Sequence, residues 1–288
     1  MLNSKLKQAL GLIKSQGIKT LAYKIYKKGI YKYYKKKLTD FQNSSISFPM
    51  IDRFKYVELN SHDTDDTLNN KLMVSIILLY QGEQESLDQC LESIITRSTY
   101  TNFEIIIGTF VEVGDFILNK YQRSIIKIIF CNNPFNYSKA INAAVNSAEG
   151  QYLVLLSDLD QIVRHNWIEE LFYSASSQDE VGVVIALPSS ANTVKMVENA
   201  REGSAIRILA LQEISRSCLM IKTELFTKNN GLNHYFLTSY ANIDLCMRIS
   251  ESGETVLYST TNLFKKIHSD EVVVNPMDKA LFLNCWEK

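Results

Sequence analysis

Short apolar runs and amphipathic segments alternate along most of this chain from residue 74 onward. The apolar runs are rich in Ile, Val and Leu, which is typical of buried strands. The segments between them repeat apolar residues at three- and four-residue spacing, which is typical of helices that bury one face. The predicted strands are Val74–Tyr80, Phe103–Ile107, Ile125–Cys131, Tyr152–Leu156 and Val181–Leu187. The predicted helices between and after them are Leu87–Ile95, Val113–Gln122, Ser138–Ala148 and Asn166–Ser174.

This alternation predicts an α/β fold, because strands that alternate with helices form a mostly parallel sheet covered on both faces. The pattern is less regular beyond residue 188. There we expect strands at Leu219–Ile221 and Val256–Tyr258, and helices at Glu224–Lys228, Tyr240–Ser250 and Asp278–Trp286.

Residues 1–37 differ from the rest in charge. They hold eleven Lys and no Asp, Glu or Arg, so the remainder of this formally neutral chain has a net charge of −11. Leu2, Leu6, Leu10 and Ile13 have helical spacing, and tyrosines lie among the lysines, which suits a membrane–water interface. The alternative is a helical pair that packs on the main domain or on a partner. Nucleic acid is not an expected partner, because an acidic body repels phosphate.

Residues 38–72 are polar and without helical period, so we expect a linker between a basic helical arm, residues 1–37, and a domain at 73–288. No apolar run reaches the roughly 20 residues that span a bilayer. The five cysteines are scattered without CxxC spacing, which favours a reducing compartment over a zinc site or disulfides. We therefore expect a cytoplasmic protein, with the arm on the inner face of the membrane.

Asp158 and Asp160 follow the predicted strand Tyr152–Leu156, and ligands of α/β sheets bind beyond the carboxyl ends of strands. Two carboxylates at i and i+2 of an extended segment face the same way and can hold one divalent ion, Mn²⁺ or Mg²⁺. His268 is a candidate third ligand from the far side of the cleft. The alternative reading is that the acids cap a turn and that His268 is a structural or surface residue.

Asp244 and Arg248 are four residues apart and can pair on one face of a predicted helix. One reading is a structural salt bridge. The other is that Asp244 is a catalytic base towards an acceptor hydroxyl.

Asn136, Lys139 and Asn142 lie at the start of the predicted helix after the third strand. The free N–H groups of a helix start can bind an anion, and Lys139 adds a charge suited to a diphosphate. The alternative is ordinary capping by Asn136 or Ser138.

An ordered set of motifs resembles family 2 glycosyltransferases of the GT-A fold, especially bacterial rhamnosyltransferase-like members. The resemblance covers residues 73–288. Its motifs are Val74-Ser-Ile-Ile-Leu-Leu, Cys90-Leu-Glu-Ser-Ile, Asn102-Phe-Glu-Ile-Ile-Ile, Phe135-Asn-Tyr-Ser-Lys-Ala-Ile-Asn142, Gly150-Gln-Tyr-Leu, Asn166-Trp-Ile-Glu-Glu-Leu, Ser217-Cys-Leu-Met-Ile, Gly231-Leu-Asn and Asp244-Leu-Cys-Met-Arg248.

The resemblance implies a GT-A, Rossmann-like fold and an inverting transfer from a nucleotide-diphosphate-sugar to a glycan or lipid-linked acceptor. It implies a divalent cation at Asp158, Asp160 and His268, whose charge offsets the leaving diphosphate. It also implies a place in cell-surface polysaccharide synthesis. Substrate-binding roles are expected for Asn136, Lys139, Asn142 and Arg248.

Two carboxylates of the family pattern are missing. Thr109 stands where the family has an Asp that contacts the nucleobase, and Asn242 stands where it has the second acid of a Glu-Asp pair. An amide cannot act as a carboxylate base, so Asp244 is the expected substitute. The alternative is a degenerate GT-A-like protein that acts as a binding or scaffolding partner of another transferase.

Overall fold

A computed structural model gives the fold of most of the chain. The described residues are 54–57, 72–121, 125–131, 135–176, 180–188, 217–259, 262–267 and 275–286. They fall into two units: Phe48–Val273 contains every described strand, and the C-terminal helix belongs to the other. The basic arm at 1–37, most of the predicted linker and His268 lie outside the described residues.

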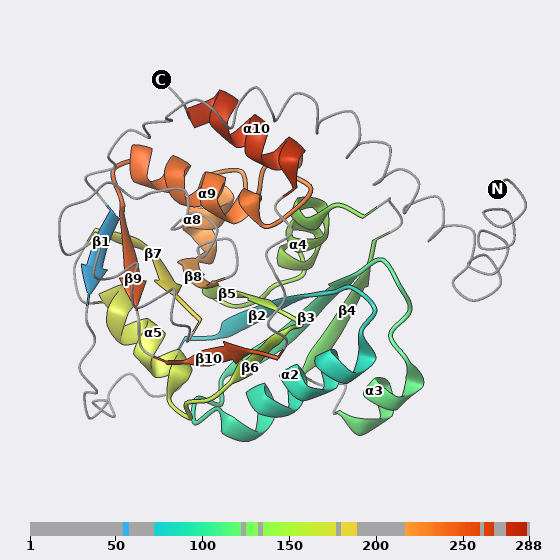
Figure 1. The fold of residues 1–288 in the computed structure, drawn as a ribbon. Coiled ribbons are helices and arrows are strands. Elements are labelled where there is room, and N and C mark those ends of the chain that lie inside the picture. Colours follow the sequence, from blue (N-terminus) through green and yellow to red (C-terminus); the bar gives the residue numbers. More distant parts are fainter. Residues whose placement is uncertain are drawn as a thin grey trace, which may run out of the picture. The chain divides into compact units, whose positions relative to one another are not determined.

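The larger unit is built on an eight-stranded sheet (Figure 1). Of its described strands, only β8 runs antiparallel to its neighbours, so the predicted mostly parallel α/β sheet is confirmed. Every predicted strand is present. In spatial order the strands are β1 (Phe54–Val57), β9 (Thr255–Ser259), β7 (Val181–Ala186), β8 (Cys218–Lys222), β5 (Tyr152–Ser157), β2 (Val74–Tyr80), β3 (Phe103–Thr109) and β4 (Ile126–Phe130).

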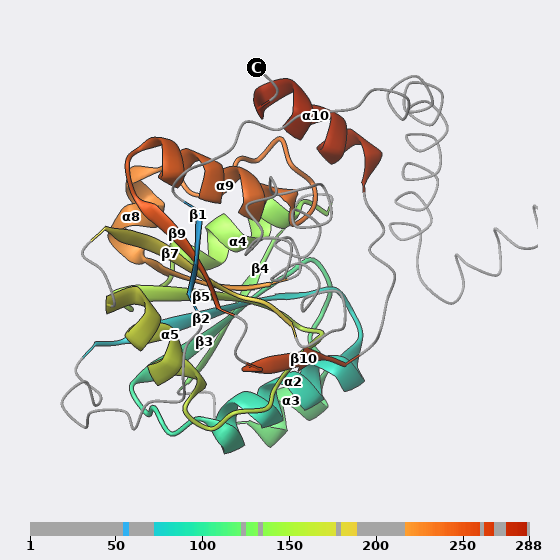
Figure 2. The ribbon, with the colours of Figure 1, turned by 60° about the vertical axis from the view of Figure 1, so that its left-hand side comes forward.

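Helices cover both faces of this sheet (Figures 1 and 2). One face carries α2 (Gln84–Arg97), α3 (Asp115–Lys120) and α5 (Trp167–Ser176). The other carries α4 (Tyr137–Val145), α8 (Thr223–Lys228) and α9 (Tyr240–Glu251). All seven residues of β2 are buried, as expected for a central parallel strand packed on both sides, and this explains its uninterrupted apolar sequence.

Three short strands were not predicted from the sequence. β6 (Asp160–Ile162) and β10 (Phe264–Lys266) pair antiparallel beside the main sheet, close to α2 in Figure 2. Three residues are too few to show strand periodicity. β1 lies within the predicted linker, where Phe54–Val57 pair with Val256–Ser259 of β9. The run Phe-Lys-Tyr-Val has the aromatic and β-branched composition of a strand, but it is only four residues long.

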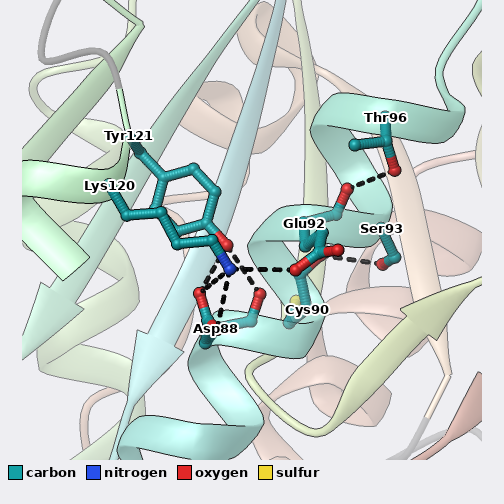
Figure 3. A network of polar contacts seen from close by, with 7 residues as sticks. All are labelled: Asp88, Cys90, Glu92, Ser93, Thr96, Lys120 and Tyr121. Atoms are coloured by element: carbon teal, nitrogen blue, oxygen red, sulfur yellow. Dashed lines mark hydrogen bonds and ion pairs between the residues drawn. The ribbon is translucent and has the colours of Figure 1, made fainter. Parts of the chain in front are cut away.

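A polar network joins α2 to the end of α3 (Figure 3). Lys120 Nζ lies 2.8 Å from Asp88 Oδ1 and 2.9 Å from Glu92 Oε2. The Tyr121 hydroxyl donates to the carbonyl oxygen of Asp88 at 2.9 Å. Lys120 and Glu92 are well exposed, so these ion pairs position α3 but add little stability.

A second network lies at the amino end of the sheet, around the buried carboxylate of Glu104. Its Oε1 accepts from the Ser75 hydroxyl and the Glu149 backbone N–H, both at 2.7 Å. Its Oε2 lies 2.8 Å from Lys127 Nζ. Burial acts to raise the pKa of Glu104, but these donors outweigh it and lower the pKa below 4.5. The carboxylate therefore ties β2, β3, β4 and the loop before β5 together.

The C-terminal helix α10 (Pro276–Trp286) forms where a helix was predicted. Asn275 Oδ1 accepts from the Met277 backbone N–H at 3.0 Å and so satisfies a donor in the first turn. Phe282 and Trp286 are one turn apart, with ring centroids 6.5 Å from each other.

Candidate functional site

The acidic pair lies where β5 ends at the carboxyl edge of the sheet. Asp158 and Leu159 form a turn between β5 and β6, and the hydroxyl of Ser157 accepts from the Leu159 N–H at 3.1 Å. The turn separates the two acids, which the sequence analysis placed side by side on one extended segment. Each carboxylate consequently has its own partners.

Asp160 is completely buried, and both of its carboxylate oxygens are engaged. Oδ2 accepts from the Ser157 backbone N–H at 2.9 Å, and Oδ1 lies 2.5 Å from Lys266 Nζ. Lys266 and Asp160 face each other in the antiparallel pairing of β10 with β6. The strand pairing thus holds a lysine ammonium against this acid.

Asp158 points towards the end of β2. Its Oδ2 accepts from the Gln81 backbone N–H at 3.1 Å, and its side chain is nearly inaccessible to solvent. Burial, with a smaller contribution from the charge of Asp160, raises the pKa of Asp158 to about 6. Burial and the charge of Asp158 likewise raise the pKa of Tyr80 at the end of β2. The edge is therefore a buried, acidic environment.

The described residues do not fit the predicted divalent ion in this arrangement. No group of three His, Cys, Asp or Glu side chains suited to a metal occurs among them, and the predicted third ligand, His268, is outside them. An ion on Asp160 would also lie close to the Lys266 ammonium, and like charges at such a distance repel strongly in a buried site. The cation at Asp158, Asp160 and His268 stays a prediction.

Tyr137 and Asn242 link α4 to α9 beside the acidic pair. The Tyr137 hydroxyl and the Asn242 amide lie within hydrogen-bond distance, at 3.2 Å to Oδ1 and 3.1 Å to Nδ2. Burial raises the pKa of Tyr137 to about 12, and the charge of Asp160 contributes to the increase. Asn242, which by sequence resemblance stands at the position of the missing family carboxylate, has a neutral phenol as its partner.

The residues predicted to bind an anion at the start of α4 make contacts within the protein. Asn136 caps the helix, accepting from the Lys139 N–H at 2.9 Å, and donates to the His234 carbonyl at 2.9 Å. Asn142 donates to the Leu232 carbonyl at 2.7 Å and accepts from the Leu232 N–H at 2.9 Å. Lys139 is exposed. Substrate binding by Asn136, Lys139 and Asn142 stays a prediction.

Asp244 and Arg248 form the predicted pair on one face of α9. Arg248 Nε donates to Asp244 Oδ2 at 2.9 Å, and Asp244 is 3% exposed. The same guanidinium donates to the Gly231 carbonyl at 2.8 Å and to the Asn229 carbonyl, which lie just beyond the end of α8. These contacts agree with the interpretation of a structural salt bridge. Base catalysis by Asp244 and substrate binding by Arg248 stay predictions.

Thr109 closes the turn after β3, where the family pattern has an acid. Its hydroxyl donates to the Val111 carbonyl at 2.7 Å and accepts from the Val111 N–H at 3.1 Å. This side chain is buried and used locally, so it provides no substitute for a carboxylate.

Two residues of this site, Lys266 and Tyr137, were not predicted from the sequence. Lys266 is two residues from Phe264, which is fully buried. Residues at i and i+2 of a strand share a face, so recognition of β10 would have placed Lys266 inward. Tyr137 was quoted within a motif, but its partner is 105 residues away in the sequence, which no local pattern can show.

The segment that carries the acidic pair is similar to a known protein family. Residues 75–200 match the family model of glycosyl transferase family 2. The matched segment includes Thr109, Asp158 and Asp160. Asn242, Asp244 and Lys266 lie beyond the matched residues.

Two curated relatives resemble part of this chain. "Uncharacterized protein y4gI" of Sinorhizobium fredii is 27% identical over 207 residues, covering 63% of this chain and 23% of that protein. The O-antigen biosynthesis protein RfbC of Myxococcus xanthus is 23% identical over 210 residues, covering 64% and 16%. The chain therefore spans less than a quarter of the length of these relatives.

The mannosyltransferase PcManGT of Pyrobaculum calidifontis, solved in complex with GDP-Man and Mn²⁺, shares the fold. Its TM-score is 0.55 at 11% identity, covering 88% of this chain and 69% of that one. The GT-A-like fold is thereby confirmed, and the family match supports the prediction of a glycosyltransferase. Among the helices that the structure describes, none is long and apolar enough to cross a membrane.

Proposed function

We propose that this chain transfers a sugar from a nucleotide-diphosphate-sugar to a glycan or lipid-linked acceptor. The observation that carries the proposal is the position of Asp158, buried at the carboxyl edge of the sheet within the family 2 segment. Ligands of α/β sheets bind at this edge. A buried carboxylate there can orient donor hydroxyls by accepting their hydrogen bonds.

The donor class draws support from the fold. The similar mannosyltransferase was solved with GDP-Man and Mn²⁺. A nucleotide-diphosphate-sugar is therefore the donor we assign to this chain, with the nucleobase on the side of β3. Because Thr109 replaces the family acid there, we infer that the nucleobase is bound by backbone groups or by other side chains.

An inverting mechanism needs a base for the acceptor hydroxyl. Asp244 is the candidate that we carry forward, and its ion pair with Arg248 must open before it can accept a proton. Arg248 then remains anchored by the carbonyls of Asn229 and Gly231. Base catalysis therefore requires Asp244 to reorient while Arg248 stays in place.

The sequence and one relative support a proposal for the acceptor and the cellular setting. The name of the Myxococcus xanthus relative refers to O-antigen biosynthesis, which supports a role in cell-surface polysaccharide synthesis by a rhamnosyltransferase-like enzyme. The lysine-rich residues 1–37 support a cytoplasmic protein at the inner membrane surface, where lysines meet anionic lipid.

Thermal unfolding with nucleotides tests the proposal. UDP, GDP and dTDP are each added to the full chain with Mn²⁺ and with EDTA, and the Tm is compared with that of the chain alone. A nucleotide at about 100 times its Kd stabilises the folded state by about 2.7 kcal/mol, so Tm rises by several degrees. The variant Asp158→Asn should lose most of this rise. An unchanged Tm with every nucleotide would contradict the donor assignment.

A non-catalytic scaffold is the second candidate, favoured by the amide of Asn242 at the family's acid position and by the ion pair of Asp244. Nucleotide-sugar hydrolysis separates the two candidates. A transferase releases nucleoside diphosphate slowly from its donor even without an acceptor, whereas a scaffold that binds the same nucleotide releases none.

A further inference from the structure

Lys266 is held against Asp160 in a way that differs from a surface ion pair. Its side chain is only 12% exposed, Asp160 is 0% exposed, and the two charged atoms lie 2.5 Å apart. Removing one member of such a pair leaves the other charge buried and uncompensated. The ion pair is therefore a buried structural feature of the carboxyl edge of the sheet.

Backbone bonds fix the position of Lys266. Main-chain groups on both sides of the pair are bonded: the Ile267 N–H donates to the Leu159 carbonyl at 2.8 Å, and the Val163 N–H donates to the Leu263 carbonyl at 2.9 Å. Lys266 Nζ also lies 5.6 Å from the centroid of the buried Phe264 ring. The ammonium is thus positioned by β10 opposite Asp160, two residues after Asp158.

The charge of a bound diphosphate must be offset at this edge. Oδ2 of Asp160 accepts from a backbone N–H and Oδ1 lies against the Lys266 ammonium, so Asp160 is poorly suited to bind a divalent ion. An ammonium carries three N–H donors, and one bond to Asp160 leaves donors for a phosphate oxygen. Lysine binds phosphate in this way as a point charge.

We propose that the Lys266 ammonium is the cation of the donor site and bridges Asp160 and a phosphate oxygen of the diphosphate without a divalent ion. This inference rests on the proposed donor class. It replaces the predicted metal at Asp158, Asp160 and His268 with a cation that belongs to the chain.

Calorimetric titration tests the inference. UDP and GDP are titrated into the full chain in EDTA and in Mn²⁺. The wild type binds at least one nucleotide in EDTA, and Mn²⁺ changes that Kd by less than about threefold. Lys266→Met weakens binding in EDTA by about tenfold or more, equivalent to about 1.4 kcal/mol. The matched control is Lys265→Met, which removes an exposed lysine from the same strand and leaves Kd unchanged.

A further variant guards against misfolding, because Lys266→Met leaves Asp160 buried without its ammonium. In Asp160→Asn/Lys266→Met both charges are removed together, and circular dichroism and Tm report its folding. The folded double variant should still lose diphosphate binding in EDTA. Nucleotide binding by the wild type only in Mn²⁺, or unchanged binding by the double variant, overturns the inference and leaves the donor assignment intact. No binding to the wild type in either buffer overturns both.

Discussion

Asn142 holds the backbone after α8 with both ends of its amide, and Gly231 makes this contact possible. Gly231 has φ +62°, and a Cβ on it would lie 2.7 Å from Asn142 Oδ1 and 2.9 Å from the Phe226 ring. The backbone conformation and the close approach both demand glycine. At the residue scale, this contact explains why Asn142 and Gly231, far apart in the sequence, both occur in the ordered set of motifs.

Gly231→Ala should lower the free energy of unfolding by roughly 2 kcal/mol, because it adds left-handed strain and a clash with Asn142. Urea unfolding measures the change. In an Asn142→Ala background the clash with the amide disappears, so the same substitution should cost less. An equal cost in both backgrounds would show that the amide contact does not limit this position.

Residue identities at the site were predictable, but most of their contacts were not. Asp158 was correctly expected at the end of a buried strand, since apolar runs and following acids are local patterns. The partner of Asn142 is 90 residues away, and that of Tyr137 is 105 residues away. Whether such a polar side chain contacts protein or ligand depends on the fold as a whole.

At the scale of elements, Arg248 connects α9 to the end of α8. Helix termini leave backbone carbonyls without helical partners, and Arg248 donates to those of Asn229 and Gly231. Asp244 holds the same guanidinium from the preceding turn of α9. The contact orients the two helices on their common face of the sheet.

Asp244→Asn and Arg248→Met should each lower the free energy of unfolding by about 2 kcal/mol, the range for hydrogen bonds to charged groups. Because the two side chains touch, the double variant should cost less than the sum of the single ones. Urea unfolding of all four proteins completes the cycle. Strictly additive costs would refute a coupling between Asp244 and Arg248.

The longer elements were predictable because their apolar residues repeat over several turns or along a whole buried strand. β6 and β10 were missed, although they carry Asp160 and Lys266, because three residues show no period. Their pairing joins segments about 100 positions apart in the chain. The ion pair between Asp160 and Lys266 could therefore be recognised only from the folded structure.

At the scale of the whole molecule, the sequence pattern does not predict the order of the strands in the sheet. Alternating strands and helices predict a parallel sheet, yet nothing local shows that β8 enters between β5 and β7. The Glu104 network is another property of the assembled sheet, since its members come from β2, β3, β4 and the loop before β5.

The stability of this sheet should depend on pH through Glu104. Its folded pKa lies below the ordinary value of 4.5, so the ionised form stabilises the fold above that value. This contribution is lost as pH falls through the folded pKa. Urea unfolding as a function of pH should show wild type more stable than Glu104→Gln near neutrality, with the difference shrinking in acid. A difference that is constant with pH would assign the effect to packing.

The reversed direction of β8 has a consequence for how the chain can change in length. β7 and β8 are antiparallel neighbours, and Ala186 faces Cys218 in their register. Antiparallel neighbours can be joined by a tight turn of two residues, whereas parallel strands need a long crossover. Geometry therefore sets almost no minimum length on the connection between Ala186 and Cys218. Insertions and deletions between these two strands can therefore be accommodated while every strand keeps its partners.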